Sequence, residues 1–319
     1  FNMVRSSVCL VTGSTGVVGS ALKSAVRENA AFSQMEFVWL SHTDADCRNF
    51  AALRKIFEIN RPTHIIHLAA RVGGLFANMN DNIGFFYDNM EMNTNVVKLC
   101  HEFQVKNGVF CLSTCVFPVD IPLPLTEEDI DKGPPHFSNE GYSISKRCLD
   151  MLVRFYREKY NYDWHCVIPT NMYGPGDNFN LEEGHVIPGL IHKCYLAKRD
   201  CTPFTIFGSG KPLRQFLYTR DAANLILNIL SSTQIENASM ILCSDSESGE
   251  VSIATVAKLI AEVFNFDGEV LFDTSRSDGA FQKTASNVRL RKLTGTDYTF
   301  TSLKDGELSK LASELSEFS

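Results

Sequence analysis

One stretch decides the fold of this chain: Val8-Cys9-Leu10-Val11-Thr12-Gly13-Ser14-Thr15-Gly16-Val17-Val18-Gly19. An apolar run typical of a buried strand leads into glycines spaced G-x-x-G-x-x-G, and a helical pattern follows as far as about Arg27. Glycines at such a turn permit a tight bend and bring backbone N–H groups close to a phosphate. Because strand, turn and helix occur in this order, the stretch predicts a dinucleotide-binding loop formed by Gly13, Ser14, Thr15, Gly16, Val17, Val18 and Gly19.

The alternation of strand and helix continues beyond this loop. Helical spacing at 50–59, 90–103 and 142–160 separates short apolar runs, which predict strands at 37–40, 63–68, 109–113 and 164–168. Strand–helix–strand units imply right-handed crossovers and a parallel sheet that is covered on both faces. We therefore expect an α/β fold built on a doubly wound parallel sheet of the Rossmann type.

After Gly174 the rhythm changes, because Gly and Pro interrupt shorter elements. The pattern here predicts helices at 186–198, 222–230 and 253–264, and strands at 204–207 and 240–243. We expect a smaller, mixed α/β substrate lobe that rests against the first domain. The expected boundaries are 4–172 plus about 219–244 for the nucleotide-binding domain, and about 173–218 plus 245–319 for the substrate lobe.

Composition excludes several classes of protein. The 319 residues are 44% hydrophobic and 21% charged, which is ordinary for a globular chain with a large core. A net charge of −7 argues against a nucleic-acid partner. No apolar run reaches the roughly 20 residues of a membrane helix, and no secretory signal is recognisable, so we expect no membrane association and a cytoplasmic location. The ten cysteines form no C-x-x-C pair, so neither a metal site nor a disulfide framework is expected.

A tyrosine and a lysine stand four residues apart in Tyr142-Ser143-Ile144-Ser145-Lys146, one turn along the predicted helix. Of nine tyrosines, Tyr142 is the only one with a lysine at this spacing. A nearby cation favours the phenolate, so we expect this tyrosine to exchange a proton with a substrate oxygen near neutral pH. Taken alone, the pair would favour a surface tyrosine and lysine on an amphipathic helix.

The glycine loop, the segment His67-Leu68-Ala69-Ala70 and the trio of Ser113, Tyr142 and Lys146 together resemble the short-chain dehydrogenase/reductase superfamily. The resemblance implies that the serine and the tyrosine hydrogen-bond the reacting oxygen, while the lysine also holds the nicotinamide ribose. It also implies a cofactor site to which Asp46, Ala69, Lys146, Pro169, Thr170, Asn171, Met172 and His185 contribute.

The end of the second predicted strand bears on the identity of the cofactor. The residues there are Ser41-His42-Thr43, with no carboxylate that would hydrogen-bond a bare ribose diol. This favours NADP(H) over NAD(H), although neither Arg nor Lys occupies these three positions to bind a 2′-phosphate.

Cys115 and Val116 stand where nucleotide-sugar dehydratases of the superfamily carry an Asp-Glu pair, which argues against dehydration by that route. The chain instead resembles the GDP-L-fucose synthase family. The resemblance runs from residue 8 to about 290 and rests on Cys115 beside the serine and on the segments Val72-Gly73-Gly74-Leu75, Pro169-Thr170-Asn171-Met172-Tyr173-Gly174-Pro175, Asp177-Asn178-Phe179, His185-Val186-Ile187-Pro188-Gly189-Leu190-Ile191, Arg214-Gln215-Phe216 and Ser277-Asp278-Gly279.

The family resemblance implies a two-part reaction on GDP-4-keto-6-deoxy-D-mannose: epimerisation of carbons 3 and 5, then reduction of carbon 4 with NADPH. Cys115 and His185 would be the acid/base pair, since both side chains can exchange protons near neutral pH. The resemblance also implies a homodimer and a GDP-sugar site formed by Lys193, Phe207, Arg214 and Asp278.

Two other functions remain open on the residues alone. One is a different nucleotide-sugar epimerase that acts at carbon 4 with tightly held NAD. The other is a non-catalytic NADP(H)-binding sensor, against which the complete set of Ser113, Tyr142 and Lys146 argues. Considered singly, Cys115 is also consistent with a small buried core residue, and His185 with a hydrogen-bonded loop residue.

Overall fold

The computed structural model describes residues 7–181, 184–232, 235–245, 250–276, 278, 280–303 and 308–317. Six parallel strands form the main sheet in the order β2-β1-β3-β4-β5-β9. The strand order reverses between β1 and β3, which confirms the doubly wound sheet. The bounds are β1 (Ser7–Thr12), β2 (Met35–Leu40), β3 (His64–His67), β4 (Asn107–Cys111), β5 (Asp163–Pro169) and β9 (Ser239–Leu242).

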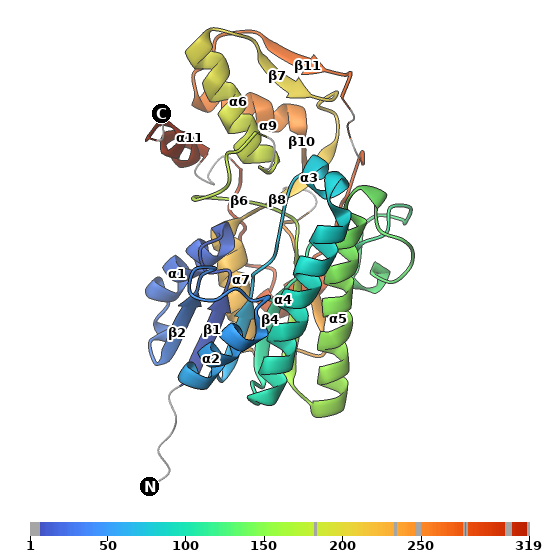
Figure 1. Cartoon of the computed structure of the whole chain (residues 1–319). Helices are drawn as coiled ribbons and strands as arrows, with labels where there is room; N and C mark the ends of the chain where they lie inside the picture. Colours follow the sequence, from blue (N-terminus) through green and yellow to red (C-terminus); the bar gives the residue numbers. More distant parts are fainter. Residues whose placement is uncertain are drawn as a thin grey trace.

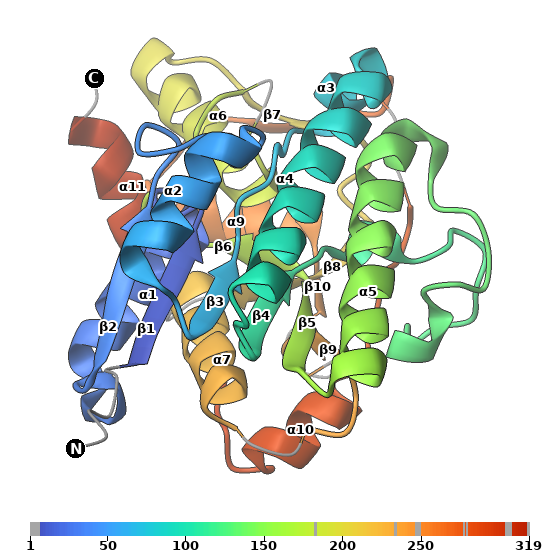
Figure 2. The ribbon, with the colours of Figure 1, turned by 60° about the horizontal axis from the view of Figure 1, so that its bottom comes forward.

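Helices cover both faces of this sheet (Figures 1 and 2). One face carries α1 (Val17–Glu28), α7 (Thr219–Ser231) and α10 (Val288–Thr294), and the other carries α2 (Phe50–Asn60), α4 (Asn82–Glu102) and α5 (Glu140–Tyr160). Successive residues of a strand point to opposite faces. In β1, accordingly, Cys9 and Val11 belong to the core under α1 and α7, while Leu10 belongs to the core under α2, α4 and α5.

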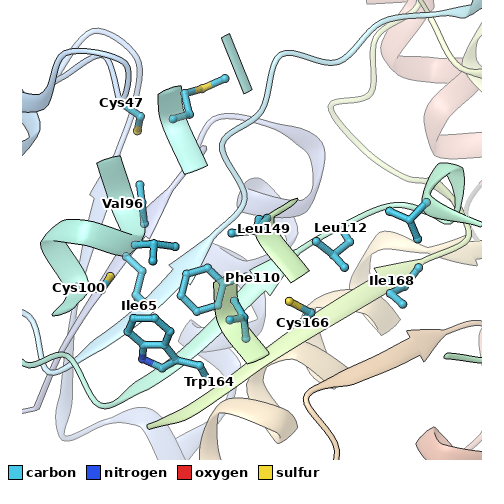
Figure 3. Packing of buried hydrophobic residues seen from close by; sticks show 14 of the residues in the cluster. Cys47, Ile65, Val96, Cys100, Phe110, Leu112, Leu149, Trp164, Cys166 and Ile168 are labelled. Atoms are coloured by element: carbon cyan, nitrogen blue, oxygen red, sulfur yellow. The ribbon is translucent and has the colours of Figure 1, made fainter. Parts of the chain in front are cut away.

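Figure 3 shows the core under α4 and α5, where Trp164, Phe110 and Ile65 are fully buried. The buried thiols of Cys100 and Cys166 fill space in the same cluster as small apolar groups. All ten cysteines are free.

Helix α4 begins eight residues earlier than expected, at Asn82 and not at Met90. The Asp81 carboxylate caps its first turn by accepting a hydrogen bond of 2.9 Å from the Gly84 amide. The first two turns have no regular apolar stripe, since Ile83 and Tyr87 are exposed, and periodicity therefore missed them. The short helix α3 (Leu75–Asn80) precedes this cap, and 3₁₀ turns occur at η1 (Ala30–Phe32), η2 (Thr114–Val116), η3 (Glu127–Asp129) and η4 (Phe137–Asn139).

A second, smaller group of elements has its own core. Strands β10 (Glu250–Ser252), β8 (Leu213–Tyr218) and β6 (Asn171–Tyr173) form one sheet, and β11 (Val270–Asp273) pairs with β7 (Phe204–Phe207). Helices α6 (Val186–Asp200), α9 (Ile253–Val263) and α11 (Leu308–Glu317) pack together beside these strands (Figure 1). Helix α11 follows residues 304–307, which lie outside the described residues.

The side chain of Gln215, in β8, forms hydrogen bonds that attach the C-terminal part of the chain to the sheet. Its amide oxygen accepts a hydrogen bond of 2.7 Å from the Ala285 N–H, and its amide nitrogen donates to the Ala285 and Ser244 carbonyls at 3.2 and 3.1 Å. Leu125 forms an isolated bridge with the same Ala285. These contacts fix the position of the segment that precedes α10. This segment contains Lys283, a residue of the candidate active site described below. Across the described residues, no helix is both long and apolar enough to span a membrane.

Candidate active site

A cavity of about 650 Å³ opens where strands β1, β3, β4 and β5 end. Ligands bind at this edge in open α/β sheets, next to the point where the strand order reverses. The predicted cofactor and catalytic residues that line it are Gly13, Thr15, Gly16, Val17, Val18, Gly19, Asp46, Ala69, Ser113, Tyr142, Lys146, Pro169, Thr170, Asn171, Met172 and His185. Ser14 does not line the cavity, because its side chain is buried and its amide donates a hydrogen bond to the Leu40 carbonyl.

The three glycines of the loop serve different purposes. Gly13 has a φ of +70°, and a Cβ there would lie 2.7 Å from the Ala69 amide nitrogen. A Cβ at Gly19 would lie 2.6 Å from the Gly13 carbonyl oxygen. At Gly16 the one nearby atom is that same carbonyl oxygen, at 3.5 Å. The fold itself therefore requires Gly13 and Gly19, whereas Gly16 leaves space on the cavity side.

Helix α1 begins directly at this loop, and no side chain caps its N-terminus. Uncapped N–H groups and the positive end of the helix dipole form an anion site. The open backbone at Gly16, the free first turn of α1 and the size of the cavity therefore suit the pyrophosphate of a dinucleotide.

Lys146 is buried and donates a hydrogen bond of 2.7 Å from Nζ to the Cys111 carbonyl. Its ammonium lies 5.8 Å from the centroid of the Tyr142 ring. The sequence led us to expect that the lysine would favour the phenolate. In the structure, however, burial raises the pKa of Tyr142 well above its usual value and lowers the pKa of Lys146. Tyr142 therefore keeps its proton near neutral pH and can donate it.

A buried polar chain holds the helices behind the site against the sheet. His67 Nε2 lies 3.1 Å from Asn93 Oδ1, and Asn93 Nδ2 donates to the Ser145 carbonyl at 3.2 Å. Because Oδ1 can only accept, the neutral imidazole carries its proton on Nε2, and Nδ1 accepts from the Thr12 hydroxyl at 2.8 Å. Burial lowers the pKa of His67 to about 3, so this side chain stays neutral at physiological pH.

Cys115 lies in η2, and its amide donates a hydrogen bond of 3.4 Å to the Ser113 hydroxyl. Its side chain is buried and is not among those that line the cavity. Burial raises the pKa of the thiol, and the hydroxyls of Ser143 and Ser113 and the charge of Lys283 oppose that rise. Sequence analysis missed Lys283, which interacts electrostatically with both Cys115 and Arg214 and belongs to the segment that Gln215 fastens.

His185 is the N-cap residue of α6 and lines the cavity together with the residues at the ends of the strands. Its Nδ1 lies 3.8 Å from Asp177 Oδ1, and the interaction with this carboxylate raises the pKa of the imidazole. The structure therefore brings Ser113, Tyr142 and His185 onto one cavity, with the Cys115 thiol next to the serine.

Two of the four predicted substrate residues, Lys193 and Phe207, lie together. The Lys193 ammonium is 3.1 Å from the centroid of the Phe207 ring, and the Arg276 guanidinium is 5.3 Å from the same centroid. The ring is 49% exposed, which leaves apolar surface available to a ligand. The sequence analysis missed Arg276, because its position next to Phe207 depends on the pairing of β11 with β7.

Arg214 and Asp278 form the other pair of predicted substrate residues and interact electrostatically. Burial lowers the pKa of Arg214. The Asp278 carboxylate is already engaged, because it accepts hydrogen bonds of 2.6 and 2.7 Å from the Ser209 amide and hydroxyl. None of the four substrate residues lines the 650 Å³ cavity. Ser277 and Gly279 of the same motif lie outside the described residues.

A ladder of ion pairs on the rim of the cavity was absent from the sequence analysis. The Arg48 guanidinium donates to both carboxylate oxygens of Asp46 and, at 2.8 Å, to Asp88. Asp88 also accepts from Arg71 at 3.1 Å, and Arg71 pairs with Asp81 at 2.8 Å. The ladder connects the loop after β2 with the loop after β3 and with α4. Across the described chain, no cluster of three or more His, Cys, Asp or Glu side chains could hold a metal ion.

Comparison with known proteins agrees with the fold. Residues 9–241 match the model of the NAD dependent epimerase/dehydratase family, and the chain belongs to this family. Within it, the chain is 47% identical to a GDP-L-fucose synthase of Dictyostelium discoideum, with 92% of this chain and 91% of that protein covered. It is 44% identical to a probable GDP-L-fucose synthase of Drosophila melanogaster, with 92% and 93% covered.

A solved structure shows the same likeness. The chain superposes on a GDP-L-fucose synthetase of Naegleria fowleri, crystallised with NADP bound, with a TM-score of 0.89 and 42% identity. The superposition covers 99% of this chain and 96% of the other.

Proposed function

We propose that the protein is a GDP-L-fucose synthase, which epimerises carbons 3 and 5 of GDP-4-keto-6-deoxy-D-mannose and reduces carbon 4 with NADPH. One observation carries this proposal: Ser113, Tyr142, Lys146 and His185 share the cavity of the glycine loop, with the Cys115 thiol next to the serine. A plain reductase needs the first three of these residues. The two further proton-exchanging groups suit the inversion of centres next to a ketone.

The residues act on different steps of this reaction. A ketone at carbon 4 acidifies the hydrogens on both neighbouring carbons, because the resulting carbanion delocalises onto oxygen. Cys115 and His185 exchange protons at these carbons. Tyr142 then donates its proton to the carbon 4 oxygen, Ser113 hydrogen-bonds the same oxygen, and the Lys146 cation lies close by. NADPH, when bound, supplies the hydride for carbon 4.

The chain's own residues hold both ligands. The glycine loop and the first turn of α1 would bind the pyrophosphate of the cofactor. Asp46 and Pro169–Met172 line the same cavity, and the family resemblance implies that the adenine lies near Asp46. Phe207 would stack on a flat face of the GDP-sugar, while Lys193 and Arg214 would bind its phosphates.

The test is to mix the protein with NADPH and GDP-4-keto-6-deoxy-D-mannose. Loss of the nicotinamide absorbance together with GDP-L-fucose in the proton NMR spectrum would support the proposal. An epimerase acting at carbon 4 with tightly held NAD would return a 4-epimer without net NADPH consumption. A non-catalytic sensor would bind NADPH and leave the sugar unchanged.

The proposal includes two domains: residues 4–172 plus about 219–244 for the cofactor, and about 173–218 plus 245–319 for the GDP-sugar. The separate core under α6, α9 and α11 supports this division. We also propose a cytoplasmic location, because the free, mostly buried thiols suit a reducing compartment.

The protein is further proposed to be a homodimer that associates through α4 and α5. These two helices lie side by side on the outside of the sheet (Figure 2), and both expose apolar side chains. Ile83 and Tyr87 of α4 are 74% and 61% exposed, and Phe155 of α5 is 52% exposed. Light scattering after size exclusion should give a dimer for the wild type and a monomer for Phe155→Glu, whereas Val288→Glu, at an exposed site on α10, should leave the dimer intact.

A further inference from the structure

The Asp177 side chain is 4% exposed, and its Oδ2 has no hydrogen-bond partner among the described residues. Its Oδ1 accepts a hydrogen bond of 2.8 Å from the Asn178 amide and lies 3.8 Å from His185 Nδ1. A buried carboxylate with an unsatisfied oxygen is costly unless the site uses it. The imidazole of His185, in contrast, is 56% exposed and lines the cavity.

Contacts in the described part of the loop between Asp177 and His185 hold these two residues close together. The Gly184 amide donates a hydrogen bond of 2.8 Å to the Asn180 carbonyl, just before His185. A Cβ at Gly184 would lie 2.4 Å from the Asn178 carbonyl oxygen and 2.5 Å from that of Asn180, so glycine is required for the chain to fold back here. His192 of α6 secures the same loop by a bond of 2.7 Å between its Nδ1 and the Phe179 carbonyl.

The geometry has a chemical consequence for the imidazole. A carboxylate on the Nδ1 side favours a proton on that nitrogen and leaves Nε2 for the cavity. The carboxylate also stabilises the imidazolium. It thereby opposes the dipole of α6, because the positive end of that dipole lies at His185 and disfavours a cation there. Tyr142 and Lys146 face the same cavity, but among the described residues Asp177 is the charged group that lies at ion-pair distance from His185.

We propose that Asp177 is a positioning residue that orients His185 and stabilises its imidazolium, so that His185 is the acid of the epimerisation. The inference rests on the proposed function. In the step, a C–H bond next to the ketone breaks, its proton goes to a base and its electron pair passes to the carbonyl oxygen. A new C–H bond then forms with the proton of His185 Nε2, and the neutral imidazole regains a proton from water.

The test compares Asp177→Asn with Asp267→Asn, the same change at an exposed site of the same lobe. The first readout is the pKa of His185, measured by NMR on histidine-labelled protein and assigned with His185→Asn. The second is the pH profile of deuterium incorporation at carbons 3 and 5, measured with oxidised NADP. In Asp177→Asn we expect the His185 pKa to fall by about one unit or more. The alkaline limb of the pH profile should shift to lower pH by the same amount. Exchange should drop at least tenfold at pH 8 and recover in part at pH 6.

Unchanged titration of His185 in Asp177→Asn would overturn the inference, as would a loss of exchange that lower pH does not relieve. If that variant does not fold, Gly184→Ala tests the same point, because it retains every charge and displaces only the loop. It should lower the His185 pKa as well, and an unchanged value would again contradict the inference. Failure of the proposed function has a different signature: no deuterium would enter the sugar with the wild-type protein, while the His185 titration could still respond to Asp177→Asn.

Discussion

The Lys146 ammonium and the Cys111 carbonyl form a hydrogen bond of 2.7 Å in the interior of the protein. This bond anchors the cation one helical turn from Tyr142, and Lys146 forms no ion pair with a carboxylate of the described residues. Lys146 lines the cavity beside Tyr142, and burial keeps the phenol of Tyr142 protonated. This arrangement suits a Tyr142 that donates its proton, because the resulting phenolate then lies next to the Lys146 ammonium.

Replacing Tyr142 by Phe removes only the hydroxyl group. Carbon 4 reduction should fall by roughly two to four orders of magnitude, the range for loss of a positioned general acid. NADPH affinity, measured by fluorescence titration, should stay close to that of the wild type, and deuterium exchange at carbons 3 and 5 should persist. Reduction at the wild-type rate would remove Tyr142 from the mechanism.

The glycine loop predicts opposite outcomes for two similar changes. Gly16→Val should fold, since a Cβ at this position meets only the Gly13 carbonyl, at 3.5 Å. It should nevertheless weaken NADPH binding at least tenfold, because the side chain enters the space of the pyrophosphate. Gly19→Ala should instead lower the melting temperature or prevent folding, since its Cβ would lie 2.6 Å from a backbone oxygen. A folded Gly16→Val protein with unchanged NADPH affinity would contradict this account of the loop.

Cys115→Ser separates epimerisation from reduction. A hydroxyl is a far weaker acid than a thiol, so deuterium incorporation at carbons 3 and 5 should fall about a hundredfold or more, while cofactor binding stays normal. Cys201→Ser, at an exposed thiol, is the matched control and should exchange like the wild type. Mass spectrometry and NMR of the recovered sugar would measure both. Full exchange by Cys115→Ser would leave the thiol with only a packing role.

The buried His67 predicts how stability depends on pH. Its pKa is about 3 in the folded protein and close to its usual 6.5 when unfolded. The unfolded chain therefore binds an extra proton below pH 6.5, and stability is lost as the pH falls toward 3, at up to about 1.4 kcal/mol per pH unit. His67→Gln should be less stable at pH 8, by about 1 to 3 kcal/mol, but should lose stability less steeply in acid.

Urea unfolding of both proteins at pH 8, 6, 5 and 4 would measure this difference. His42→Gln, at an exposed position, should keep the wild-type slope. Parallel pH curves for wild type and His67→Gln would mean that His67 is not the group responsible.

Local periodicity predicted the strands of the main sheet and the glycine loop, because each depends on a short run of neighbouring residues. It also predicted that Tyr142 and Lys146 lie one turn apart. It could not predict that burial would raise the pKa of Tyr142, since spacing carries no information on how deeply the pair lies. Periodicity also missed the start of α4, because the first turns of this helix depend on a carboxylate cap and not on an apolar stripe.

Other parts of the site depend on contacts between distant segments. Lys283 reaches Cys115 because Gln215 and Leu125 fix the segment that contains it, and no spacing in the sequence links these residues. Arg48, in the loop after β2, likewise meets Asp88 of helix α4, which is 40 residues away in the chain. The Asp177–His185 pair is closer in sequence, but it depends on a turn that only Gly184 permits.

Strand β9 has a consequence for synthesis of the protein on the ribosome. It pairs with β5, yet β5 ends at Pro169 and β9 begins at Ser239. While the intervening residues are being translated, the nascent chain already contains the glycine loop, Tyr142 and Lys146, but the hydrogen-bonding groups along one side of β5 have no partner. The unpaired N–H and C=O groups of an exposed strand edge can form hydrogen bonds with other chains. Premature termination before Ser239 should therefore yield aggregates, and the nascent chain should need a chaperone until β9 has emerged.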